Sequence, residues 1–214
     1  MNTEPLKNFP VGSVGHSLSL MAGVWHDRVE IYSPNGTPLA EDPASGTPGP
    51  SPFENLVYIS FDGERLVQTN VAYRGRPLAS RTFSGRLVDG ILRFDKLGPN
   101  DPGHIGVSGG SGVLFFVAGE LGEGTQRYCE PDCVRLLGPS ARTRTTVLYR
   151  EGRIIRTLTA HGTRLSPQVD RRLWCDPRGV DGPVHDGYHP TAVFNSAPVP
   201  QESDAPNNTG GTLY

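Results

Sequence analysis

Short apolar runs separated by tight turn signals fill the middle of this chain. Residues 53–97 contain four such runs, at 53–61, 64–73, 79–88 and 91–97, and each is rich in β-branched and aromatic residues, which favour strands. Asp62-Gly63 and Asp89-Gly90 separate two pairs of these runs, and Asp-Gly favours the type I′ turn of a two-residue hairpin. Sequential strands joined by such turns predict an antiparallel meander.

The same alternation extends the meander in both directions. Further strands are predicted at 23–32, at 113–118, at 126–137 with an interruption near Pro131, and at 143–150 and 153–165 on either side of Glu151-Gly152. The glycine-rich stretch 98–112 is predicted to be a flexible loop, and 16–22 a short helical turn that plugs one barrel end. A meander of this length must close or be covered, because an open sheet exposes its edges. The predicted fold is all-β, an antiparallel up-and-down β-barrel of about ten strands.

Length and composition divide the chain and exclude some partners. The 214 residues suit one domain with a tail: an irregular segment at 1–15, the barrel at 16–165, and an irregular tail rich in proline and glycine at 166–214. The net charge of −2 indicates no nucleic-acid partner. No signal peptide and no apolar stretch long enough to insert into a membrane is recognisable, so a cytoplasmic protein is expected.

The cysteines and histidines predict no metal site and no cofactor. Cys129 and Cys133 bracket a turn, and two reduced thiols are favoured there over a disulfide or a zinc site. The histidines at 26, 104 and 161 are predicted to lie at the surface or in loops, and those at 185 and 189 in the tail. No catalytic motif is recognisable by its spacing.

The hairpin around Glu151-Gly152 predicts a charge inside the barrel. A two-residue turn places Val147 opposite Arg156. The more apolar face of this hairpin is predicted to point inward, and it carries Tyr149, Val147, Thr145, Ile154, Leu158 and Arg156. A buried guanidinium needs an anion, which is either a group of a ligand or an internal carboxylate such as Glu30.

The hairpin around Asp62-Gly63 leaves its facing open. Pairing Ile59 with Leu66 puts Tyr58, Val67 and Tyr73 on one face, and Val57, Gln68 and Asn70 on the other. Both faces are half apolar. If the second face points inward, Gln68 and Asn70 are polar groups that orient a ligand; otherwise they are solvated.

Gly23-x-Trp25 at the start of the first strand resembles a motif of the calycin group, which includes lipocalins, fatty-acid-binding proteins and nitrobindins. The resemblance covers about residues 16–165. It implies that Trp25 packs across the closed end of the barrel and that Arg164, after the last strand, lies against it. A secretion signal, a C-terminal helix and the middle lipocalin motif are missing, so the chain is most similar to intracellular bacterial lipocalin-like proteins.

The barrel and this resemblance together imply a binding protein for a small, largely apolar molecule with one polar or anionic end. Trp25 and Arg164 are expected to be structural. The expected ligand contacts come from four of the predicted strands, and they are Arg156, Tyr149, Val147, Leu158, Gln68, Asn70, Tyr73 and Phe116.

Two alternative functions use the same interior. The first is a cofactor-independent cyclase or isomerase acting on a polyketide- or terpenoid-like substrate, with Arg156, Tyr149 and Tyr58 as its catalytic residues. The second is a haem-binding barrel. Both are analogies with other calycin barrels.

Overall fold

The computed structural model describes residues 8–40, 52–74, 79–96, 103–119, 128–129, 131–150 and 152–169, except for the side chains of 72–74, 79–80, 128–129 and 150. Helix α1 spans Val14–Met21. The strands are β1 (Gly23–Tyr32), β2 (Phe53–Phe61), β3 (Arg65–Arg74), β4 (Ala79–Val88), β5 (Ile91–Phe94), β6 (His104–Gly110), β7 (Val113–Ala118), β8 (Tyr128–Cys129), β9 (Asp132–Gly138), β10 (Ala141–Arg150) and β11 (Arg153–Ser166). The predicted residues 170–214 of the tail lie outside the described part.

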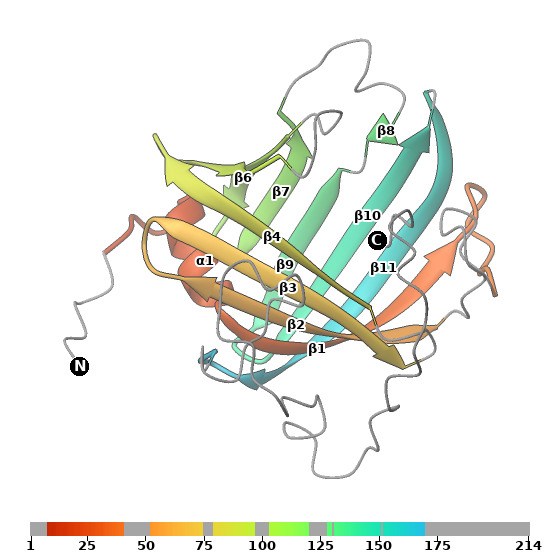
Figure 1. Ribbon diagram of the computed structural model, residues 1–214, viewed down its shortest axis with the longest axis horizontal. Helices are drawn as coiled ribbons and strands as arrows, with labels where there is room; N and C mark the ends of the chain where they lie inside the picture. The colour runs from red at the N-terminus through yellow and green to blue at the C-terminus, as the bar shows by residue number, and fades with distance from the viewer. Residues whose placement is uncertain are drawn as a thin grey trace.

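The strands close into the predicted antiparallel barrel (Figure 1). Neighbours in sequence pair with one another, and β11 pairs with both β1 and β10, which closes the sheet. The eleven described strands fill ten positions, because β8 and β9 pair one after the other with the same edge of β10. Closure leaves no open edge in the ring of strands.

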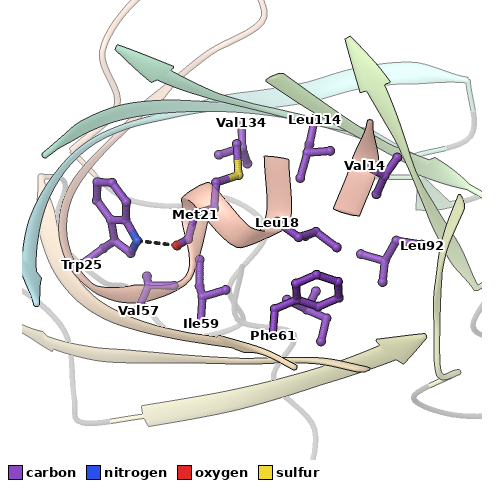
Figure 2. Close-up of a cluster of buried hydrophobic side chains, with 11 residues drawn as sticks. Val14, Leu18, Met21, Trp25, Val57, Ile59, Phe61, Leu92, Leu114 and Val134 are labelled. Carbon is purple, nitrogen blue, oxygen red and sulfur yellow. Dashed lines mark hydrogen bonds between the residues drawn. The ribbon is translucent and has the colours of Figure 1, made fainter. Parts of the chain in front are cut away.

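Helix α1 closes one end of the barrel, as the sequence predicts (Figure 2). Ser13 caps the helix by accepting a hydrogen bond from the His16 backbone N–H, at 3.2 Å. The buried helix residues Val14, Leu18 and Met21 pack against strand residues of the core, which include Trp25 and Phe61. No helix among the described residues is long and apolar enough to cross a membrane.

One glycine-rich stretch predicted to be a loop is a strand. β6 occupies His104–Gly110 and pairs with both β5 and β7. The Phe116 ring packs over Gly106, where a Cβ atom would lie 2.9 Å from the ring carbon Cε1. Glycine there permits a close approach between side chain and backbone, so the glycine content reflects packing within a strand and not a loop.

Candidate functional site

Burial along β1 shows which side chains face the barrel interior. Trp25, Asp27, Val29 and Ile31 are buried, and the residues between them are more exposed. Because opposed residues of antiparallel strands share a face, the strand register carries this assignment around the barrel.

Trp25 packs against two guanidinium groups at the closed end. Its side chain is fully buried, and its indole N–H donates to the Met21 carbonyl oxygen at 2.9 Å (Figure 2). The Arg164 carbon Cζ lies 4.5 Å from the centre of the Trp25 ring, which is the contact that the calycin resemblance implies. The Arg142 carbon Cζ lies 4.6 Å from the same ring. Burial and the charge of Arg142 lower the pKa of Arg164.

A buried ion pair forms the next layer of the interior. Arg142 Nη2 donates to Asp27 Oδ2 at 2.7 Å and Arg142 Nε to Asp27 Oδ1 at 3.2 Å, and both side chains are at least 96% buried. Gly162 on β11 lies between the two residues in the strand register. A Cβ atom at 162 would collide with Asp27 Oδ1 and lie 2.8 Å from Arg142 Cγ.

The Gly162→Ala variant is therefore expected to be less stable by about 1–3 kcal/mol, the usual cost of overpacking a filled interior. Urea denaturation followed by circular dichroism measures the loss. An alanine variant of Gly138, where no atom lies within 4 Å of an added Cβ, is the control. Equal stability of the two variants would contradict the packing of the ion pair against Gly162.

A second polar group lies on the wall formed by β9 and β10. Arg144 Nε donates to Asp132 Oδ2 at 2.5 Å, and the Thr146 hydroxyl donates to Asp132 Oδ1 at 3.1 Å. Phe116 is paired with Asp132 across β7 and β9, and its ring packs edge-on against Phe94 with 5.5 Å between centroids. Charge and aromatic surface therefore adjoin on this wall.

The structure settles the facing of β3. Val57 pairs with Asn70 and Ile59 with Gln68, and Val57 and Ile59 belong to the same core cluster as Trp25. Gln68 and Asn70 therefore point inward.

On β4, Arg81 and Phe83 share this inward face, because they pair with Asn70 and Gln68. The Arg81 guanidinium lies 5.1 Å from the centre of the Phe83 ring. A cation, two amides and an aromatic ring therefore occupy neighbouring positions on the inner face of β3 and β4.

Arg156 points inward as predicted, but its partner across the hairpin is different. The predicted register holds for Arg150 with Arg153 and for Tyr149 with Ile154, and a bulge then pairs Leu148, not Val147, with Arg156. Arg156 is fully buried. Its positive charge therefore lies inside the barrel, beneath the solvent-accessible surface.

Leu158 also points inward and is buried. Glu30 lies on the outer face of β1, where it accepts a hydrogen bond from Tyr32 at 2.6 Å. It is therefore not the internal carboxylate considered as a partner for Arg156.

The bulge moves several predicted interior residues outward. Tyr149, Val147 and Thr145 alternate with the inward residues of β10 and lie on the outer face, and Ile154 is 41% exposed. Their predicted inward facing is therefore wrong. Tyr58 belongs to an outer cluster with Val24 and Leu56. The side chain of Tyr73 is outside the described part.

The cyclase or isomerase hypothesis requires Arg156, Tyr149 and Tyr58 to lie together on the inner face. The described part of the structure does not bring these three residues together there.

His26 and His161 lie on outer positions, with His26 Nε2 3.0 Å from Glu54 Oε2, whereas His104 lies at an inward position of β6. The described residues contain no cluster that holds a metal ion. Cys133 is a free thiol whose pKa is raised by burial and by the charge of Asp132.

Sequence reasoning missed most of the interior charges. Asp27, Arg81, Asp132, Arg142 and Arg144 all face inward. The signal for Asp27 was present, because it follows the inward Trp25 by two residues on one strand and must share its face.

The likeness to known proteins is one of fold. No known family matches the sequence, and no curated protein matches it. A protein of unknown function from the DUF3598 family of Nostoc punctiforme is 14% identical with a TM-score of 0.54, over 77% of this chain and 53% of that one. The chain thus spans about half the length of that protein.

The S-type phycobiliprotein lyase CPES of Guillardia theta is 10% identical with a TM-score of 0.50, over 71% of this chain and 92% of that one. Both likenesses concern the fold alone, a closed antiparallel barrel.

Proposed function

We propose that this protein encloses a small, largely apolar molecule with one anionic end inside its barrel. The observation that carries the proposal is the charge of the interior. The described strand residues that face inward beyond the Trp25 layer include four arginines, Arg81, Arg142, Arg144 and Arg156, and two aspartates, Asp27 and Asp132. Positive charges outnumber negative charges among these described residues, and a charge attracts an anion more strongly in the low dielectric of a barrel interior than it does in bulk water.

The apolar part of the ligand has aromatic partners on the same inner face. Phe83, Phe94 and Phe116 are only partly buried and point inward from β4, β5 and β7. An apolar wall with a few convergent polar groups is the usual composition of a small-molecule site. A structure of the same fold belongs to a phycobiliprotein lyase, which supports a role for this barrel with a small molecule.

Two fluorescent probes that differ by one anionic group test the proposal. 8-Anilinonaphthalene-1-sulfonate and N-phenyl-1-naphthylamine share one ring system, and only the first carries a sulfonate. Both are expected to bind, the anionic probe more tightly. In the Arg81→Met variant the affinity for the anionic probe should fall about tenfold, or 1.4 kcal/mol. That for the neutral probe should change less than about twofold, since Met replaces the aliphatic stem of the arginine and removes its charge.

Arg93→Met is the matched control, because Arg93 lies on the neighbouring strand β5 but is exposed on the outer face. This variant changes the net charge by the same amount and should bind both probes as the wild type does. Failure of both probes to bind, or equal loss of the anionic probe in both variants, would refute an anion site inside the barrel.

A further inference from the structure

Gln68 and Asn70 form a polar pair on the inner face of β3 that is only half satisfied. The Gln68 side-chain nitrogen Nε2 donates to Asn70 Oδ1 at 3.0 Å. That bond leaves the Gln68 carbonyl oxygen Oε1 and the Asn70 amide group Nδ2, and neither makes another hydrogen bond within the described part of the chain. Each side chain is partly buried, so the interior surface at this pair is open to a small polar group.

The pair has a direction that selects among polar groups. The Asn70 end presents N–H donors and adjoins Arg81, which offers only donors. The Gln68 end presents an acceptor and adjoins Phe83, an aromatic ring with no polar atom. A ligand group that fits both ends must accept a hydrogen bond from Asn70 at one atom and donate a hydrogen bond to Gln68 from a neighbouring atom.

We infer that the ligand carries an amide-type group, a carboxamide or a lactam, held by Asn70 and Gln68. The carbonyl oxygen of such a group accepts from Asn70 Nδ2, and its N–H donates to Gln68 Oε1. A carboxylate or an ester only accepts, and it would place an oxygen against Gln68 Oε1. A site built to hydrogen-bond a donor rejects an analogue that lacks it, because its own buried group is left unpaired.

This inference rests on the proposed function, since it identifies a second polar group on the same ligand. Arg156 on β11 and Asn70 on β3 lie three strand positions apart in the sheet order, about 14 Å along the sheet at the usual strand spacing. β2, β3 and β4 lie in front of β9, β10 and β11 in Figure 1, so the amide pair and Arg144 face the interior from different walls. Arg81 adjoins Asn70, whereas Arg144 and Arg156 lie on other strands, so the anionic group and the amide group contact different side chains of one interior.

Displacement of bound N-phenyl-1-naphthylamine by two matched competitors tests the inference. Naphthalene-1-acetamide and methyl naphthalene-1-acetate have the same apolar body, but only the amide donates a hydrogen bond. The wild type should bind the amide about tenfold more tightly than the ester. Gln68→Leu should abolish this preference, and so should Gln68→Met, which keeps about the length of the side chain but removes the acceptor Oε1. Thr145→Leu, on the exposed outer face of β10, should leave it intact.

Each outcome separates the two proposals. Equal affinity of the wild type for amide and ester, with the fluorescent probe bound, overturns the inference and leaves the proposed function standing. A preference that survives in both Gln68 variants also overturns it, because the amide then binds elsewhere. Failure of the fluorescent probe itself to bind overturns the proposed function and the inference with it.

Discussion

Replacing Trp25 by alanine is expected to cost about 3–5 kcal/mol of stability, the usual range for truncating a buried aromatic side chain. The variant loses the packing of a fully buried ring, the hydrogen bond from the indole N–H to Met21, and the surface on which Arg142 and Arg164 lie. Because the ring joins helix α1 to the closed end of the barrel, the loss affects both elements (Figure 2). Urea denaturation followed by far-ultraviolet circular dichroism measures it.

His26→Ala is the control, since His26 is the next residue of β1 and points outward to Glu54. Its partly exposed contact with Glu54 contributes less than about 1 kcal/mol. Similar losses in the two variants would contradict the assignment of inner and outer faces on β1.

The Arg142→Met variant should lose about 3–5 kcal/mol, because it leaves the Asp27 carboxylate buried without its cation. Restoring neutrality in the Asp27→Leu/Arg142→Met double variant should recover most of this loss, since well-packed apolar pairs replace buried ion pairs at little cost. Denaturation curves of the wild type, both single variants and the double variant give the coupling energy directly.

If the double variant is as unstable as the sum of the single variants, the two side chains do not interact, and the ion pair at the closed end is wrong. The double-variant result also bears on ligand binding. Removal of one cation and one anion leaves the net charge of the interior unchanged, so the preference for the anionic probe should persist.

Strand register shows why the fold was predictable and part of the site was not. Around Asp62 the predicted pairing of Ile59 with Leu66 is wrong by two residues, because Ile59 pairs with Gln68. The Asp62 carboxylate accepts hydrogen bonds from the backbone N–H groups of Glu64 and Arg65 and holds a longer turn. Side chains alternate between the two faces of a strand with a period of two. An error of two residues therefore left the predicted division of side chains between the two faces correct.

Around Gly152 the error is one residue and has the opposite consequence. The predicted turn is correct, but the bulge at Leu148 and Tyr149 shifts the register by one and exchanges the inner and outer faces of β10. Tyr149 and Val147 therefore leave the predicted interior, and Thr146 and Leu148 enter it. The local sequence does not predict this bulge, since both Ile154 and Ile155 are residue types that favour a strand.

The Asp89-Gly90 hairpin shows where local chemistry is decisive. Val88 pairs with Ile91, and Asp89 and Gly90 have φ angles of 51° and 77°, as a type I′ turn requires. The polar side chains of the interior were harder to predict. The neighbours of residues such as Arg81 and Asp132 are set by pairing between separate strands, which the local sequence does not show. Pattern reasoning treats a charged residue as solvent-facing, and the closed barrel reverses that for these two.

A crystal structure of the protein with 8-anilinonaphthalene-1-sulfonate is the most direct test of a binding barrel. The account predicts electron density for one probe molecule within the ring of strands, with its sulfonate near Arg81 or Arg144 and its rings against Phe83, Phe94 or Phe116. An interior filled by protein side chains, with probe density only on the outer surface, would contradict it.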